Sequence, residues 1–307
     1  MTEPNPQDLA ERRGDRVHRI NASGNLLLAL AKGVGGWLSG SRALTADAVH
    51  SIGDLATSAV AWVSFKVARQ PPDEDHHFGH GKAEAAAGVF VGLVLLWVGV
   101  SVLGSAVRSP GAAYESGRAA LALGFAVVSF AGNLWLARLT REAADELASA
   151  GLRALERDNS ADALTSVLVM AGVLGGTLGW TWCEPIATGV IGIFIAWMGI
   201  SSVREGLGVL MDRVSDPEMR GRIETVARAV AGVRGVQRVR VHPLGGALRA
   251  DVEVSVDENL SVRAGHDIAH AVENAILDGE PTMVQVSVHV NPDDPSQSGE
   301  VREQVGE

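Results

Sequence analysis

The sequence predicts an α-helical membrane protein with six transmembrane helices, followed by a C-terminal α+β domain in the cytoplasm. Hydrophobic residues make up 47% of the 307 residues, and the mean hydropathy is +0.16, which is high for a soluble protein. Apolar runs of about 20 residues, the length that crosses the hydrocarbon core as a helix, recur before residue 210 and not after it. The chain therefore divides into a membrane part and a soluble part.

The membrane part contains six apolar segments in order. They are residues 20–39, 43–68, 85–108, 117–139, 153–179 and 184–207. Their Gly, Ala and Ser residues, as in GVGGW and VLGGTLG, favour helices whose backbones pack closely in lipid. We expect a cytoplasmic N-terminal segment over 1–19, a transmembrane domain over 20–210, an α+β domain over 211–292 and a disordered polar tail over 293–307.

The soluble part alternates between helical and strand periods. SDPEMRGRIETVARAVAG has helical spacing, with Asp216 and Pro217 as its cap and first turn. VQRVRVHPL and LRADVEVSV alternate like strands around a Gly245-Gly246 turn. SVRAGHDIAHAVENAIL is again an amphipathic helix, and MVQVSVHVN predicts a third strand.

The basic residues of the short loops predict the orientation in the cell membrane. Most of them flank one side, namely Arg12, Arg13, Arg16, Arg19, Lys66, Arg69, Lys82, Arg138 and Arg141, and the other side has Arg42, Arg108 and Arg118. The positive-inside rule then places both termini of a multi-pass protein in the cytoplasm. No cleavable signal peptide is visible, because the first 19 residues are polar and charged.

Charge and cysteine content exclude two classes of chemistry. The net charge of -10 argues against a nucleic-acid partner and suits cations at the cytoplasmic end. The single cysteine, Cys183, forms no internal disulfide and supplies no thiolate cluster for a soft metal.

The predicted second and fifth spans each carry a pair of ionisable residues at helical spacing. His50 and Asp54 are four residues apart, and so are Asp158 and Asp162. Each such group costs about 2.5–3.5 kcal/mol at the centre of a spanning helix, so it is a functional candidate. Two helices that turn these pairs toward each other present one imidazole and three carboxylates, which is a four-ligand cage for a divalent cation.

Each of these residues also has a structural interpretation. Asp158, Asn159 and Ser160 precede an apolar run and could cap a helix. Asp47 lies near the outer end of its span, where capping or hydrogen bonding is favoured over ligation. His50 and Asp54 could form a buried hydrogen-bonded pair.

Two further sets of residues are candidates outside the spans. Asp73, His76 and His80, in PPDEDHHFGHGKAE, suit Zn²⁺ or a similar ion, although a solvated loop of mixed charge explains them equally well. The soluble domain adds His242, Glu253, His266 and His289, for which surface residues without metal are the commoner outcome.

Three motifs in this order, ADAVHSIGD, HHFGHGKAE and ERDNSADAL, closely resemble the cation diffusion facilitator transporters. The resemblance covers roughly residues 15–292. It implies a transport site at His50, Asp54, Asp158 and Asp162, and a loop site at Asp73, His76 and His80.

The resemblance also implies a ferredoxin-like cytoplasmic domain that forms a homodimer and binds metal. The matching candidates there are His242, His266 and His289, whereas Asn291 and Glu253 depart from the pattern. Lys82 and Asp212 match residues that form a charge pair locking the dimer near the membrane surface.

The implied activity is export of a divalent metal cation in exchange for protons by alternating access. Metal ligands must lose protons to bind, so protons and metal compete for one cage. Imidazole changes charge most readily near neutral pH, which makes His50 the natural switch. Zn²⁺ is favoured as the transported metal, and Fe²⁺, Co²⁺, Ni²⁺ and Mn²⁺ remain open.

Two other classes of function remain alternatives. A metal channel would pass ions without proton exchange, but no filter sequence is visible. A membrane-tethered metal sensor would use the α+β domain, but an anchor does not explain four intramembrane ligands. An enzyme is not expected, because no nucleophile, phosphate loop or catalytic metal site with a general base is evident, and no catalytic cofactor is predicted.

Overall fold

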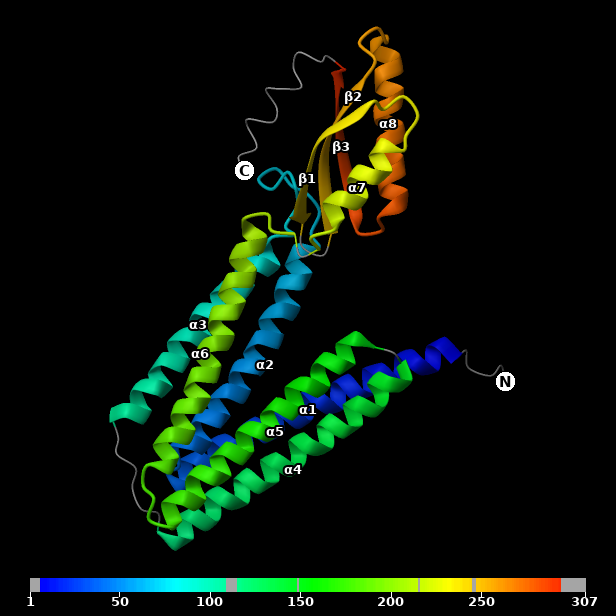
Figure 1. Cartoon of the computed structure of the whole chain (residues 1–307). Helices are drawn as coiled ribbons and strands as arrows, with labels where there is room; N and C mark the ends of the chain where they lie inside the picture. Colours follow the sequence, from blue (N-terminus) through cyan, green and yellow to red (C-terminus); the bar gives the residue numbers. More distant parts are fainter. Residues whose placement is uncertain (1–5, 109–114, 148, 215, 245–246, 294–307) are drawn as a thin grey trace. The chain divides into compact units, whose positions relative to one another are not determined.

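The computed structural model describes residues 6–108, 115–147, 149–214, 216–244 and 247–293. It has two compact units, one of Met1–Val60 with Phe90–Val203 and the other of Ala61–Val89 with Arg204–Glu307. The first part of the chain forms the long helices α1 (Pro6–Ser39), α2 (Arg42–Ala68), α3 (Ala83–Arg108), α4 (Ser116–Leu147), α5 (Ala150–Thr177) and α6 (Cys183–Leu210) (Figure 1). The expected Gly245-Gly246 turn and the tail beyond Asp293 lie outside the described residues.

Four of the described helices are long and apolar enough to cross a membrane. They are α3, α4, the Gly151–Thr177 part of α5, and α6. Helices α1 and α2, with 34 and 27 residues, are also long enough, but each carries an ionisable side chain within its apolar stretch, namely Lys32 and Asp47. Both of these side chains are fully buried inside the protein, which is how a helical bundle accommodates charge within a membrane.

Helices α1 and α4 extend past the apolar segments that predicted them. The predicted spans begin at residue 20 and end at residue 139, whereas the helices that contain them begin at Pro6 and end at Leu147. Hydropathy marks only the lipid-facing part of a helix. The polar extensions are stabilised by a small cluster of Val17, Ala143, Ala144 and Leu152 and by an ion pair of 2.7 Å between Arg13 and Glu146.

Small residues let the helices approach closely, as the sequence predicted. A Cβ atom built on Gly199 of α6 would lie 2.5 Å from the backbone nitrogen of Leu96 in α3. Gly99 of α3 likewise faces the backbone of Ala196 at 2.5 Å. Helices α1, α4 and α5 lie side by side (Figure 1). At the α3–α6 contacts, glycine has no side chain, so the two helix backbones can meet directly.

The C-terminal part has the order α7 (Met219–Arg228), β1 (Gly235–Leu244), β2 (Ala247–Val256), α8 (Val262–Gly279) and β3 (Met283–Pro292). Strand β2 is central, antiparallel to β1 and parallel to β3. Alternate β2 residues, Ala250, Val252 and Val254, join Ile223 of α7 and Ile276 of α8 in one core. Both helices cover one face of the sheet (Figure 1), so the predicted ferredoxin-like α+β domain is confirmed.

The first turn of this domain differs slightly from the prediction. Helix α7 begins at Met219, after the expected Asp216-Pro217 start. Asp216 still orders the approach, because its Oδ1 accepts the backbone N–H of Glu218 at 2.9 Å. The carboxylate therefore shapes the turn before the helix instead of capping it.

We expect Gly199→Ala to destabilise the protein. Its new methyl group would meet the α3 backbone, which cannot rotate away, at a cost of about 1–3 kcal/mol or roughly 2–10 °C in Tm. Thermal unfolding in detergent measures the loss. Gly124→Ala is the matched control, because no atom lies within 4 Å of its added Cβ. Equal Tm values for the two variants would contradict the close α3–α6 contact.

Candidate metal centres

Three predicted ligands from two helices form one cluster in the first unit. His50 and Asp54 of α2 and Asp162 of α5 each offer an atom within 4.8 Å of the others. The Nε2 atom of His50 lies 3.3 Å from Asp162 Oδ1 and 3.7 Å from Asp54 Oδ2. One nitrogen and two carboxylate oxygens at these distances are a suitable donor set for a divalent transition metal.

Local helix geometry positions the cluster. His50 and Asp54 are four residues apart in the middle of α2, so both side chains lie on one face. The ring of Phe194, from α6, lies edge-on to the His50 ring with centroids 5.4 Å apart. This contact packs the imidazole against α6. Little solvent reaches the ring, because His50 is only 3% exposed.

Asp158 lies one turn before Asp162 on α5 and is exposed. It is not part of the three-residue cluster. It does not cap a helix either, because α5 begins at Ala150 and its N-cap is Ser149, whose hydroxyl accepts the N–H of Leu152 at 3.3 Å. The capping interpretation of Asp158, Asn159 and Ser160 is therefore wrong.

The cluster is closed at one end and accessible at the other. Side-chain exposure rises from 0% at Asp47 to 4% at His50, 12% at Asp162 and 38% at Asp54. The closed end faces the connection between α1 and α2. Here Glu184 of α6 accepts hydrogen bonds from the Ser41 hydroxyl and the Arg42 backbone at 2.9 and 2.8 Å.

A buried lysine beside this cluster was missed at the sequence level. Lys32 of α1 donates to Asp47 at 3.1 Å and to Ser51 at 2.9 Å, and both Lys32 and Asp47 are fully enclosed. Thr165 of α5 donates to Asp47 at 2.7 Å, and Ser166 lies 3.5 Å away. The detectable signal was a lysine in the middle of an apolar span, since a charge at that depth requires a partner.

The pairing of Lys32 decides the charge of the cluster. Because Lys32 balances Asp47, the formal charge around a neutral His50 comes from Asp54 and Asp162. Two carboxylates in a low-dielectric site repel each other until protons or a cation relieve the repulsion. A divalent cation balances the two charges completely.

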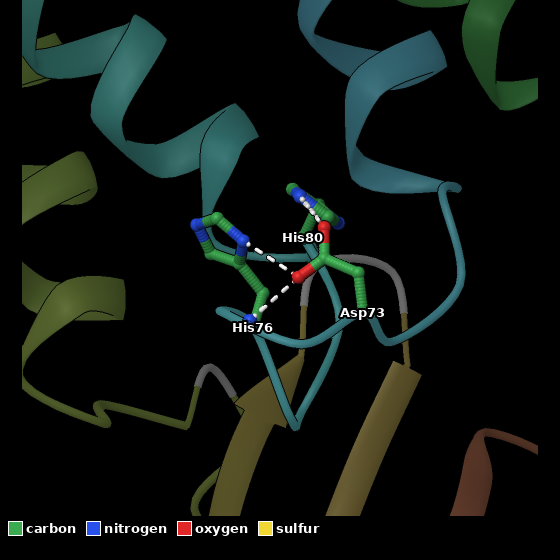
Figure 2. Close-up of side chains that lie close together, drawn as sticks. All are labelled: Asp73, His76 and His80. Carbon is green, nitrogen blue, oxygen red and sulfur yellow. Dashed lines mark hydrogen bonds and ion pairs between the residues drawn. The ribbon is translucent and has the colours of Figure 1, made fainter.

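A second cluster lies in the loop between α2 and α3, in the second unit. Asp73, His76 and His80 offer atoms within 4.8 Å of one another, and Figure 2 shows both rings beside the Asp73 carboxylate. His76 Nδ1 lies 3.0 Å from Oδ1 of Asp73, and His80 Nε2 lies 3.4 Å from Oδ2. Nδ1 of His80 is buried without a hydrogen-bond partner in the described part of the chain. Two imidazole nitrogens beside one carboxylate are a donor set that suits a metal ion.

The loop backbone keeps the Asp73 carboxylate ionised. The backbone N–H of His76 donates to Asp73 Oδ1 and, as the largest effect, lowers the pKa of this carboxyl below its ordinary 3.8. The N–H of Asp75 donates to the same oxygen at 3.0 Å. A lowered pKa means that these hydrogen bonds are complete above about pH 4 and are lost as the pH falls through the lowered value.

The expected charge pair lies in the same unit. Lys82 Nζ donates to Asp212 Oδ1 at 2.9 Å, and this bond is the main reason that the pKa of Asp212 is lowered. His242 bridges Asp212 and Asp251, with contacts of 3.3 and 3.4 Å. The loop that carries Lys82 is thus tied to β1 through Asp212.

The cytoplasmic candidates do not gather within one chain. No described cluster of three potential ligands contains His242, Glu253, His266 or His289. Glu253 is the register partner of His289 on the neighbouring strand, and it also contacts Arg238 at 3.1 Å. His266 lines a pocket of about 450 Å³ with Asn291, whose amide donates to Gln237 at 2.9 Å.

The comparison with protein families decides the identity. The model described as the cation efflux transmembrane domain matches residues 19–211, and that of the cation efflux protein cytoplasmic domain matches residues 215–293. The chain belongs to the cation efflux family, the cation diffusion facilitators. The transmembrane match contains all of the helices that form the first cluster. This cation efflux protein is accordingly a membrane-integral metal transporter and not an enzyme.

Named relatives span bacteria and plants. The manganese efflux system protein MneP of Bacillus subtilis is 30% identical, over 90% of this chain and 95% of its own length. Metal tolerance protein 2 of rice is 29% identical, over 92% of this chain and 80% of its own length. The magnetosome protein MamB of Magnetospirillum gryphiswaldense is 30% identical, over 87% and 90%. These relatives support efflux of divalent metal cations as the function of the family member described here.

Substitution of the two carboxylates one turn apart on α5, Asp158 and Asp162, tests which of them binds the ion. We expect Asp162→Asn to lower the metal affinity of the transmembrane cluster by about tenfold or more, because it removes a charged ligand from an enclosed site. Asp158→Asn, the matched control, should have a clearly smaller effect, since Asp158 lies outside the cluster. Calorimetric titration in detergent measures both. Equal losses would make Asp158 a full ligand.

Acidification tests the loop cluster. Because the pKa of Asp73 is lowered below its ordinary 3.8, this carboxylate stays ionised from about pH 5 to 8 and takes up no proton in competition with the metal. We expect Asp73→Asn to weaken metal binding at every pH in that range, because it removes a charged ligand that is ionised throughout the range. His77→Ala is the control, because His77 lies outside the cluster. Unchanged metal affinity in Asp73→Asn would contradict Asp73 as a ligand.

Proposed function

We propose that this transporter exports divalent transition-metal cations from the cytoplasm in exchange for protons. The observation that carries the proposal is the cluster of His50, Asp54 and Asp162 between α2 and α5. Its two carboxylates and one imidazole match a divalent cation in charge and in donor type. We propose Asp158, one turn toward the accessible end, as a weaker fourth ligand, since it lies outside the cluster of the other three residues.

Proton coupling follows from the chemistry of the ligands. Metal binds only to the deprotonated imidazole and carboxylates, so each binding event releases protons and each protonation weakens metal binding. Cytoplasmic metal displaces protons at the accessible end of the cluster. After the helices rearrange, protons from the opposite side displace the metal, which completes alternating access.

Zn²⁺ is the favoured cargo, because a site of few ligands with one imidazole suits its low coordination number. Mn²⁺ is the strongest competitor, because the donor set is rich in oxygen and the relative MneP is named a manganese efflux protein. Fe²⁺, Co²⁺ and Ni²⁺ accept the same donors.

The remaining architecture supports a regulated dimer. We propose a homodimer through the cytoplasmic domain, in a cell-membrane protein with both termini in the cytoplasm and domain limits near residues 20, 210 and 292. Asp73, His76 and His80 bind a second metal ion in the loop. The cytoplasmic candidates His242, Glu253, His266 and His289 would bind metal only if the second chain contributes further ligands.

Metal flux into proteoliposomes with an imposed pH gradient tests the function. Zn²⁺, Mn²⁺, Fe²⁺, Co²⁺ and Ni²⁺ are presented separately, with one dye for metal and one for internal pH. We expect uptake that dissipates the gradient, and a loss of at least about tenfold in Asp54→Ala. Glu142→Ala, which removes an exposed carboxylate from α4, is the control.

Each other outcome identifies a different function. Metal flux without proton movement would show a channel. Metal binding without flux in a folded protein would show a membrane-tethered sensor. The order of rates among the five ions ranks the metals, and faster transport of Mn²⁺ than of Zn²⁺ would overturn the zinc preference.

A further inference from the structure

The buried pair of Lys32 and Asp47 does not bind the cargo in the proposed function. Lys32 Nζ is shared between Asp47 Oδ1 at 3.1 Å and Ser51 Oγ at 2.9 Å, and both of these partners belong to α2. The side chains of Lys32 and Asp47 are fully enclosed. Lys32 therefore moves with α2, and it keeps Asp47 neutralised and unavailable as a metal ligand.

The contacts of Asp47 with α5 are of a different kind. Thr165 Oγ1 lies 2.7 Å from Asp47 Oδ1 and 2.9 Å from the backbone carbonyl oxygen of Asp162. Ser166 Oγ lies 3.5 Å from Asp47 Oδ2 and 3.1 Å from the same carbonyl. A hydroxyl has one proton and can donate it to one acceptor at a time. Each hydroxyl can therefore release Asp47 and keep a hydrogen bond inside α5.

These contacts lie between the metal cluster and the closed end of the site. Asp47 is one turn from His50 on α2, and Thr165 is one turn from Asp162 on α5. One further turn along the same two helices, Leu44 and Val169 belong to the core and are 0% exposed. An ion that leaves toward the α1–α2 connection must pass these contacts.

We propose that Asp47, held by Lys32, is a latch that closes the metal site on the side opposite the cytoplasm. The latch opens when Thr165 and Ser166 turn their hydroxyls to the Asp162 carbonyl, which frees α5 from α2. Asp47 keeps its ion pair with Lys32 throughout, so no buried charge is left unpaired, a state that would be strongly unfavourable. The proposal rests on the proposed function, because it assigns the exit side of that transport site.

Accessibility of a reporter cysteine tests the latch without measuring transport. The reporter is Val169→Cys in a Cys183→Ser background, which removes the single native cysteine. Proteoliposomes are exposed to a membrane-impermeant maleimide from the side that carries the α1–α2 connection. We expect slow labelling with the latch intact and labelling about tenfold faster in Thr165→Val. A tenfold larger population of the open state corresponds to about 1.4 kcal/mol.

Thr165→Ser is the conservative control, because it keeps the hydroxyl and removes only a methyl group. It should retain the slow labelling, and equal rates in the Val and Ser variants would overturn the latch. If Thr165→Val does not fold, Ser166→Ala and the charge-free pair Lys32→Met with Asp47→Leu, which removes the acceptor oxygens, test the same contacts. Both should label faster while calorimetry finds unchanged metal affinity, and a loss of metal affinity in the charge-free pair would make Asp47 a ligand instead.

The outcomes separate the latch from the proposed function. Coupled metal flux that requires Asp54, together with labelling that does not depend on Thr165, would retain the transporter and reject the latch. Labelling controlled by Thr165 in a protein without any flux would reject proton-coupled export and leave a gated α2–α5 contact.

Discussion

The membrane unit depends on one constraint, which is that an ionisable group away from water must be balanced by a partner. Lys32 and Asp47 satisfy it with each other, and Ser51 and Thr165 occupy further hydrogen-bonding positions. His50 and Asp162 satisfy it across the α2–α5 contact. The partners come from three helices, so the same pairs that make the charges tolerable also fix how α1, α2 and α5 lie against one another.

This constraint explains why the transmembrane cluster is suited to a cation. Once Lys32 has balanced Asp47, the two carboxylates of the cluster, Asp54 and Asp162, share His50 as the one basic group of that cluster. The repulsion between these two carboxylates would destabilise an ordinary core. Here it favours the binding of a divalent ion or of protons, which relieve it. Structure and transport therefore use neighbouring residues of α2 in opposite ways, since Asp47 is neutralised and Asp54 is left available.

Other kinds of interaction hold the remaining parts of the molecule together. The loop cluster is largely exposed, and backbone N–H groups of the loop itself orient Asp73. The cytoplasmic domain is held by a hydrophobic core between one sheet face and two helices. Helices α3 and α6 meet through glycines, where backbone approaches backbone. Backbone hydrogen bonds, apolar packing and close backbone approach therefore hold these parts of the molecule.

The sequence by itself determined the elements and the main candidate ligands, because helical and strand periods and four-residue spacings are local properties of a chain. It predicted the six long helices, the α-β-β-α-β order, the helix face that carries His50 with Asp54, and the loop that carries Asp73 and His76. Only the tertiary structure decided which helices meet and at what rotation. That rotation pairs Asp47 with Lys32, a residue fifteen positions away on another helix, and leaves Asp158 outside the cluster that contains Asp162. Such pairings depend on long-range packing, which no local spacing encodes.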